Sequence, residues 1–399
     1  MKIAFVGMGQ SYPSTVWMGR MRKMLADRVV VNIDDMRNVD RGVKLAADTR
    51  YVPRKMNYLN RFLSAVRLSN RTHDKLRSQW MLQTITQSGA KLAFVHFLDY
   101  ATRFTDVWRQ LDMPVVVHCH GYDITWDLLH PDTLTSYHAP GYTALVRALP
   151  DNVWFIANST HTKDQLLQLS INPNKIFLKR FGVPLSDRPR SESQQNDTSI
   201  LFLGRLVDFK GPLETAHAFS QILLNYPQLR LDVAGDGGLG EDLDRLILEL
   251  GLSDHVVRHG FVSPARGKEL RGQAAIFTAH NQTDRVTNQK EAFGVSMLEA
   301  MGEGVPVVTG RSGGIPDFIQ HDQNGLLFQS GDINSHAEML DDLMSSKKRR
   351  MSLGTAAWET VRDNYQADHE LEDMTRIFQH VSEVGSLPTI SETISSRAA

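Results

Sequence analysis

Short apolar runs alternate with longer amphipathic segments along most of the 399-residue chain. The runs have the length of buried strands, and the segments between them have the apolar spacing of helices. This alternation predicts βαβ units and therefore parallel sheets. We expect strands at Lys2–Val6, Val29–Ile33, Leu92–His96, Val115–His118 and Trp154–Ala157, and again at Ile200–Leu203, Leu229–Ala234, Ala275–Phe277 and Val305–Val308.

A polar, proline-containing stretch at residues 186–198 interrupts the alternation. It predicts a linker between two doubly wound, Rossmann-like α/β domains, residues 1–188 and 199–365. We expect residues 366–384 to form a C-terminal helix that packs back on the N-terminal domain, and residues 385–399 to be a mobile tail. Ligands of such sheets bind beyond the carboxyl ends of the strands, so the expected site is a cleft where the two domains face each other.

Composition narrows the class of protein. Apolar residues make up 41% and charged residues 22%, which excludes a disordered or fibrous chain. The single cysteine, Cys119, excludes a disulfide framework and indicates a reducing compartment. Since no apolar run reaches 18 residues, we expect no signal peptide and no membrane span, and a cytoplasmic location.

The two halves of the chain differ strongly in charge. Residues 1–190 carry 26 Lys and Arg against 15 Asp, a net charge of +11, whereas the remainder carries 18 bases against 30 acids, a net charge of −12. An anionic partner would therefore meet the N-terminal domain.

A glycine turn follows the first expected strand. Gly7 and Gly9 begin a dinucleotide-binding pattern, but its third glycine would fall at Tyr12, and Pro13 delays the helix. We therefore expect no nicotinamide or flavin cofactor. Either the loop is a plain chain reversal, or Gly9 leaves room for a phosphate bound in the cleft.

Two cations follow the first strand of the second domain. Arg205 and Lys210 lie at the carboxyl end of Ile200–Leu203, just before Pro212 opens a helix. An arginine fork and a lysine point charge can together hold a diphosphate. In isolation, such residues are more often simply solvated.

Two carboxylates flank a second glycine turn. Glu291 precedes Gly294, and Glu299 lies within the helix that the turn opens, whose N-terminal amides can receive an anion. At about 1.5 Å of rise per residue the two side chains are too far apart to share a proton, but they can bind separate hydroxyl groups of one elongated ligand. The alternative is a Glu favoured by the helix dipole and an exposed helix Glu.

Six segments in a fixed order carry a family resemblance. They are Phe202-Leu-Gly-Arg205 with Lys210-Gly211, Val233-Ala-Gly-Asp236-Gly237, the Glu291–Glu299 segment, Gly304-Val-Pro306-Val-Val, Gly313-Gly314-Ile-Pro316-Asp317 and Asn324-Gly325-Leu-Leu. Together they resemble the retaining GT-B glycosyltransferases of family four, over residues 200 to about 330. The N-terminal half resembles this family more loosely, and its glycine loop departs from the family pattern.

The resemblance implies roles for individual residues. Glu299 would bind the ribose hydroxyls of a nucleotide sugar, Glu291 would contact the transferred sugar, and Arg205 and Lys210 would neutralise the diphosphate. The remaining donor-binding residues that it implies are Gly9, Phe261, Gly294, Val295 and Ser296.

No metal and no cofactor are expected for this chemistry, because fixed cations and helix amides stabilise the departing diphosphate. The sequence offers one Asp-x-Asp pattern, Asp242-Leu-Asp244, which lies in a helical pattern and is expected to be a solvated face.

The N-terminal domain contributes His120 and Asp123 after the strand Val115–His118. By resemblance, His120 would contact the donor sugar through its side chain or backbone, although a lone histidine more often has a structural role. Asp123 would orient His120 or lie near the acceptor. His118 is expected to pack in the core because side chains alternate along a strand.

A basic segment at residues 50–77 holds eight Lys and Arg against Asp74 alone. Apolar residues at 59, 62, 63 and 66 give it the spacing of an amphipathic helix, which can rest on anionic lipid or meet a phosphorylated acceptor. Plain solvated charge is an equally good interpretation. Nucleic acid is not expected as a partner, because no nucleic-acid-binding motif accompanies the charge.

The predicted function is transfer of a hexose-type sugar from a nucleotide diphosphate to a saccharide, lipid-linked or other hydroxyl acceptor, in surface polysaccharide or glycolipid assembly. Two alternatives remain open. One is a sugar-nucleotide epimerase or a phosphorylase on the same architecture; no pyridoxal-lysine motif is present for a phosphorylase. The other is a catalytically silent, sugar-nucleotide-binding partner of another transferase.

Overall fold

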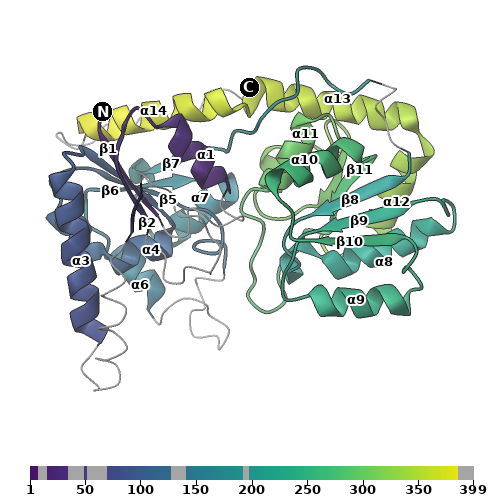
Figure 1. Ribbon diagram of the computed structural model, residues 1–399, viewed down its shortest axis with the longest axis horizontal. Helices are drawn as coiled ribbons and strands as arrows, with labels where there is room; N and C mark the ends of the chain where they lie inside the picture. Colours follow the sequence, from purple (N-terminus) through teal and green to yellow (C-terminus); the bar gives the residue numbers. More distant parts are fainter. Residues whose placement is uncertain (8–15, 35–48, 52–69, 127–140, 192–196, 385–399) are drawn as a thin grey trace.

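The computed structural model describes residues 1–7, 16–34, 49–51, 70–126, 141–191 and 197–384. It contains two parallel sheets, one from each half of the chain, and so confirms the predicted α/β architecture. The two halves form two lobes that lie side by side (Figure 1). We call them the N-terminal and the C-terminal lobe.

The N-terminal lobe is built on a seven-stranded sheet with the order β3-β2-β1-β4-β5-β6-β7. Every strand pairs in parallel with its neighbours, as expected for a sheet built from βαβ units. Its strands are β1 (Ile3–Gly7), β2 (Val29–Asp34), β3 (Thr49–Tyr51), β4 (Leu92–His96), β5 (Val115–His118), β6 (Val153–Ala157) and β7 (Ile176–Leu178). Its helices are α1 (Val16–Met24), α3 (Asn70–Gln87), α4 (Leu98–Arg103), α5 (Thr105–Gln110), α6 (Tyr142–Arg147) and α7 (Thr160–Gln168), with the 3-10 turn η2 (Pro173–Lys175).

The C-terminal lobe is built on a six-stranded sheet with the order β10-β9-β8-β11-β12-β13, again parallel throughout. Its strands are β8 (Ser199–Leu203), β9 (Arg230–Ala234), β10 (Val256–Gly260), β11 (Ile276–Ala279), β12 (Val307–Gly310) and β13 (Leu326–Phe328). Its helices are α8 (Pro212–Leu223), α9 (Gly240–Glu249), α10 (Pro264–Gln273), α11 (Val295–Gly302), α12 (Ile333–Ser345) and α13 (Lys347–Asn364), with 3-10 turns η4 (Asp208–Lys210) and η5 (Ile315–Asp317).

The last helix returns to the first lobe. α13 is followed by α14 (Ala367–Val384), which runs along the N-terminal lobe beside the chain's first strand (Figure 1). Phe378 of α14 packs edge-on against Phe94 of β4, with ring centroids 5.0 Å apart. Buried Lys179, just after β7, forms an ion pair with buried Glu370 of the same helix. The chain therefore crosses between the lobes twice, and we retain the domain limits given above as a proposal.

Several predictions concern residues outside the described part of the chain. These are the role of Gly9, the amphipathic helix around residues 59–66, part of the linker, and the tail at 385–399.

One residue of the basic segment corrects its interpretation. Arg77 lies on α3 and is buried, with its guanidinium 5.7 Å from the centre of the Phe104 ring, so it contributes no surface charge. Within the described ranges, no helix is both long and apolar enough to cross a bilayer.

Candidate active site

The carboxyl ends of three neighbouring strands position the loops of the candidate site. β8 ends at Leu203, β11 at Ala279 and β12 at Gly310, and because the strands are parallel their following loops meet at one edge of the sheet. Of the residues predicted to bind the diphosphate and the sugar, those of the C-terminal lobe at Arg205, Lys210, Glu291 and 294–296 lie in the first two of these loops or at the start of α11.

Arg205 and Lys210 share an aromatic neighbour. The 3-10 turn η4 places Phe209 between them, and both cationic groups lie 5.5 Å from the centre of its ring. Phe209 is buried, Arg205 is exposed and Lys210 is half-buried. The buried ring therefore fixes two cations at the carboxyl end of β8, as the sequence predicted for a diphosphate site.

Lys210 pairs with Glu291. Its ammonium donates to Glu291 Oε2, and the same oxygen accepts a 3.1 Å hydrogen bond from Asn281 Nδ2. Glu291 is only 8% exposed, so a cation and an amide hold this carboxylate in a nearly dry position. Asn281, which follows β11, was not predicted; only its place after a strand end could have suggested it.

Gly294 opens α11 in the left-handed region, with φ 104°. The first N–H groups of any helix have no acceptor within it, so the amides of Val295 and Ser296 are suited to an anion beside Lys210. Phe261 follows the edge strand β10 at the same end of the sheet, and its side chain is 60% exposed.

Glu299 is held from both lobes. Its Oε2 accepts a 3.0 Å hydrogen bond from Arg271 of α10, and Arg20 of α1 lies 3.7 Å from its Oε1. Arg271 is buried and also binds Glu303 through its Nε at 3.0 Å. The sequence did not predict Arg271, because the pairing joins residues 28 positions apart that only the fold brings together.

Two adjacent glycines permit close backbone approaches, Gly313 within the C-terminal lobe and Gly314 also between the lobes. Gly313 has φ 54°, and a Cβ there would clash with the backbone of Glu291; one on Gly314 would clash with Ser159 of the N-terminal lobe. Nearby, Asp317 Oδ2 accepts a 2.8 Å hydrogen bond from the backbone N–H of Thr160 at the start of α7. The Gly-Gly-Ile-Pro-Asp motif is thus a point of contact between lobes.

The loop after β5 meets the loop before α11. A Cβ built on Gly121 would lie 3.8 Å from Cβ of Ala292, so the backbone after His120 lies next to Glu291. Asp123 holds this loop: its Oδ1 accepts hydrogen bonds from the N–H groups of His120 (3.0 Å) and Gly121 (2.7 Å). The structure therefore places the loop of His120 and Asp123, from the N-terminal lobe, beside the segment that holds Glu291.

Asp123 is fully buried, and burial raises its pKa to about 6 although backbone hydrogen bonds oppose the shift. Its Oδ2 accepts a further 2.8 Å hydrogen bond from the N–H of Leu98. Of the two roles predicted for Asp123, this geometry favours orientation of the His120 loop over contact with an acceptor.

The ring of His120 faces into its own lobe. Its Nε2 lies 3.0 Å from Nδ1 of His96, and its ring centroid lies 3.9 Å from that of Trp17, with the two planes tilted by 33°. His118 is fully buried, as predicted, with its ring centroid 4.1 Å from that of His120. In this conformation the backbone of His120, rather than its ring nitrogens, faces the neighbouring lobe.

The Asp242-Leu-Asp244 pattern lies on the exposed helix α9, as predicted. Arg245 pairs with Asp242 at 2.7 Å, and Arg258 pairs with Asp244. Both carboxylates are therefore engaged by arginines on the surface.

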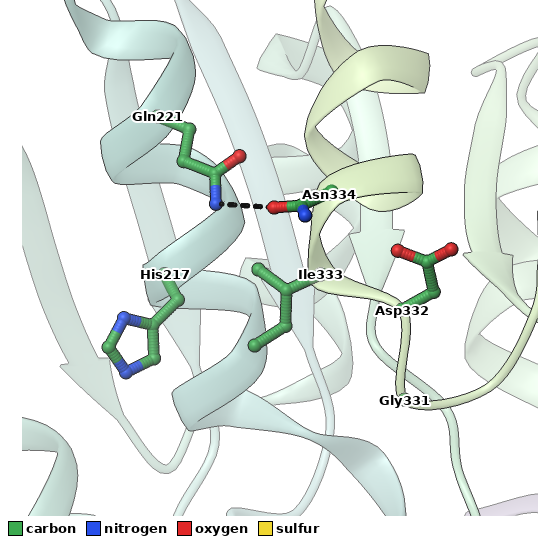
Figure 2. A pocket seen from close by; sticks show the side chains of 6 residues that line it. All are labelled: His217, Gln221, Gly331, Asp332, Ile333 and Asn334. Atoms are coloured by element: carbon green, nitrogen blue, oxygen red, sulfur yellow. Dashed lines mark hydrogen bonds between the residues drawn. The ribbon is translucent and has the colours of Figure 1, made fainter.

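A hollow of about 390 Å³ lies elsewhere on the C-terminal lobe, between α8 and the start of α12 (Figure 2). Gln221 donates a 3.2 Å hydrogen bond to Asn334 across it. None of the predicted site residues lines this hollow; its lining residues are His217, Gln221, Gly331, Asp332, Ile333 and Asn334.

Comparison with known proteins agrees with this geometry. The family model "Glycosyl transferases group 1" matches residues 185–360. A GDP-mannose-dependent alpha-(1-6)-phosphatidylinositol monomannoside mannosyltransferase from Mycolicibacterium smegmatis is 27% identical over 263 residues, which span 63% of this chain and 66% of the relative.

Two solved structures share the fold. HepE from Anabaena, in complex with UDP, has a TM-score of 0.72 at 17% identity, and the match covers 95% of this chain and 100% of that chain. Sucrose-phosphate synthase from Thermosynechococcus elongatus has a TM-score of 0.74 at 15% identity, with 96% and 100% covered. Residues 185–360 therefore match the glycosyl transferases group 1 family, and the chain as a whole has the GT-B fold that these two structures share.

Proposed function

We propose that this protein transfers a hexose-type sugar from a nucleotide diphosphate sugar to a hydroxyl acceptor, with retention of configuration. The observation that carries the proposal is the convergence of Arg205, Lys210 and Glu291 with the start of α11 at one edge of the sheet. The cations and amides receive the diphosphate, Glu291 contacts the sugar, and Glu299 receives the ribose.

The chemistry follows from where charge develops. Breaking the glycosidic bond leaves negative charge on the diphosphate, and fixed cations stabilise this state more than the ground state. The departing phosphate can accept the proton of the attacking hydroxyl on the same face of the sugar, which retains configuration. The proposed reaction needs no metal ion and no other cofactor.

Donor binding can be tested by thermal melting with UDP-, GDP- and ADP-sugars in the presence of a chelator. The matching donor alone is expected to raise the melting temperature strongly, since a ligand at 100 times its Kd stabilises the folded state by about 2.7 kcal/mol. The base is left open, because the relative is named for GDP-mannose and the solved structure holds UDP.

Glu299→Ala is expected to weaken binding of that donor by about 10- to 100-fold, the equivalent of a hydrogen bond to a charged group. Glu303→Ala is the matched control, because it removes the other carboxylate on Arg271. Equal losses in both variants would assign the effect to Arg271 instead. A protein that no sugar nucleotide stabilises would contradict the proposal.

For the acceptor, we propose a saccharide or a lipid-linked hydroxyl compound in surface polysaccharide or glycolipid assembly. The named acceptor of the mycobacterial relative is a phosphatidylinositol glycolipid, and the N-terminal half of this chain carries a net charge of +11. A cytoplasmic enzyme attached to the inner face of a membrane is the arrangement we expect.

Liposome flotation tests this attachment. We expect the protein to float with anionic vesicles and to remain behind with neutral ones, because each cation near an anionic surface contributes about 1 kcal/mol. Equal partition between the two vesicle types would rule out the proposed membrane contact while leaving the transferase proposal intact.

A further inference from the structure

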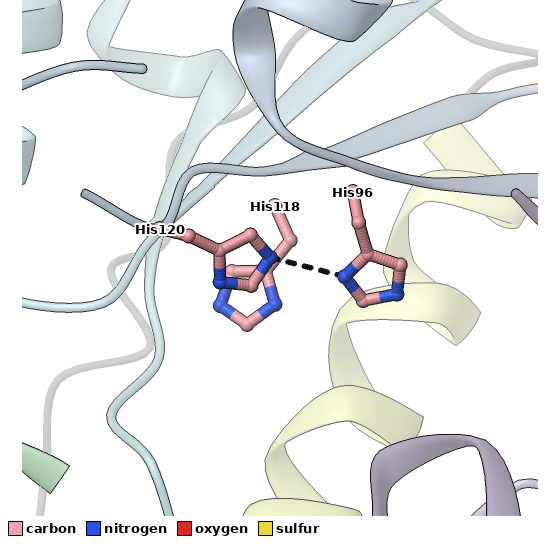
Figure 3. Close-up of side chains that lie close together, drawn as sticks. All are labelled: His96, His118 and His120. Atoms are coloured by element: carbon pink, nitrogen blue, oxygen red, sulfur yellow. Dashed lines mark hydrogen bonds between the residues drawn. The ribbon is translucent and has the colours of Figure 1, made fainter. Parts of the chain in front are cut away.

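Three histidines converge inside the N-terminal lobe beside the candidate site. His96 ends β4, His118 ends the neighbouring strand β5, and His120 follows two residues later. Figure 3 shows the three rings close together, with a hydrogen bond between His96 and His120. One ring nitrogen of each lies within 4.8 Å of the others, a grouping that can hold a metal ion.

Most of the ring nitrogens in this cluster are unsatisfied. His118 is fully buried, and within the described part of the chain neither its Nδ1 nor its Nε2 has a hydrogen-bond partner; the same holds for His96 Nε2 and His120 Nδ1. A buried polar group without a partner costs about 1–3 kcal/mol. An unsatisfied group of this kind calls for a ligand or an ordered water.

A pair of buried histidines in the C-terminal lobe, His280 and His336, shows how buried ring nitrogens are hydrogen-bonded elsewhere in this fold. Gly331 N–H donates to His280 Nε2, so His280 donates through Nδ1 to His336 Nδ1, and His336 Nε2 donates to Thr278 Oγ1. Thr278 in turn donates to the carbonyl of Val308. Each ring nitrogen of His280 and His336 thus has a hydrogen-bond partner, whereas within the described residues neither ring nitrogen of His118 has one.

The surroundings of the cluster keep the three imidazole rings neutral, which is the form that binds a metal ion. Burial lowers the pKa of His96, His118 and His120 well below the ordinary value, which leaves each ring with one lone pair. Lys179 is the nearby charge, and its ammonium is engaged by Glu370, so the pair brings no net charge. Metal binding would break one hydrogen bond of the cluster, the one between His96 and His120.

We propose that His96, His118 and His120 bind one divalent first-row transition ion of the zinc class through their ring nitrogens. Imidazole is a preferred ligand of such ions, and three histidines with an open fourth position make a known type of site. Zn–N bonds of about 2.0–2.1 Å in a tetrahedron set nitrogens about 3.3–3.4 Å apart. The 3.0 Å pair is near this value, and side-chain shifts on the order of 1 Å bring in the third ring.

Of the three residues, His120 is the one with part of its surface exposed, so we place the open fourth position and the entry route on its side of the cluster. An ion held there keeps the ring of His120 within its own lobe, away from the donor sugar that this ring was predicted to contact. Occupation of the site is therefore expected to inhibit sugar transfer; this consequence, unlike the binding itself, rests on the proposed function.

The test is titration of the metal-free full-length protein with Co²⁺, followed by its visible absorption, and with Zn²⁺ in competition with a chromophoric chelator. Wild type is expected to bind one ion and to show the intense bands of four-coordinate Co²⁺. His118→Phe is expected to weaken binding by more than about 100-fold, which exceeds the loss caused by changing a residue that only hydrogen-bonds to a metal ligand. Phenylalanine keeps an aromatic ring beside Phe181 and removes only the two unsatisfied nitrogens.

His96→Gln is the second variant, in case His118→Phe does not fold, and it should lose binding to the same extent. His217→Gln, in the hollow beside Asp332, is the matched control for surface histidine binding and should bind as wild type does. Binding unchanged in His118→Phe and His96→Gln, or lost in His217→Gln, overturns the proposal, as does six-coordinate Co²⁺ in wild type.

Inhibition is measured separately. Transfer activity is expected to fall in step with site occupation in wild type, to recover with chelator, and to be unaffected by the ion in His118→Phe. If no donor is ever turned over, the proposed function fails, while the absorption titration still decides whether the three histidines bind metal.

Discussion

Replacing Lys210 by alanine is expected to lower kcat for sugar transfer by about 100- to 1,000-fold, the loss typical of one donor aimed at developing charge. Lys210 loses its place beside the diphosphate, and Glu291 is left nearly buried without its ammonium partner. The remaining carboxylate then repels the departing diphosphate. Both effects raise the energy of the transition state more than that of the bound donor, so kcat falls more than KM rises.

Steady-state rates with the matching donor check this result. Arg245→Ala, on exposed α9, is the matched loss of a positive charge in the same lobe and should change kcat little. Glu291→Ala should also nearly abolish turnover, but it leaves the cation in place, so donor binding should persist. Full turnover in Lys210→Ala or Glu291→Ala, with the fold intact by circular dichroism, would contradict the assigned roles.

Replacing Lys179 by methionine is expected to destabilise the docking of α14 on the N-terminal lobe by about 3–5 kcal/mol. Lys179 and Glu370 are both fully buried, and Glu370 Oε2 also accepts a 3.0 Å hydrogen bond from the N–H of Gly182. Without the ammonium, the folded protein retains an uncompensated buried charge. Hydrogen exchange of the α14 amides measures the change as faster local opening.

Two further variants isolate the cause. Arg376→Met breaks an exposed pair with Asp373 on the same helix and should cost no more than about 1 kcal/mol. Lys179→Met with Glu370→Leu removes both charges and should recover much of the loss, because buried pairs are often replaceable by apolar residues. Unchanged exchange in Lys179→Met would show that the pair does not fasten α14.

Sequence periodicity predicted the inner strands of both sheets and missed the outer ones. All nine expected strands exist, several with the predicted bounds, such as β4 and β5. The four strands that were not predicted, β3, β7, β10 and β13, are the four edges of the two sheets. Edge strands pair on one side only and can be short, so they leave a weaker apolar signal.

Position after a strand end was also sufficient to find the loops of the candidate site. Arg205, Lys210 and Glu291 were predicted from local sequence and lie together, because neighbouring parallel strands end at one edge of the sheet. For Arg77 the same local reasoning was wrong. Its place in a basic run suggested solvent, whereas the fold buries it against Phe104.

Periodicity and spacing within short segments were enough to predict the pair of Rossmann-like sheets, the family resemblance and the local order of the C-terminal loops. Three contacts could be found only in the folded protein: that of Arg271 with Glu299, that of Lys179 with α14, and the meeting of the three histidines. These contacts join side chains from separate elements. The local sequence around one side chain carries no information about its distance from a side chain on another element. That distance is fixed by how the strands and helices pack.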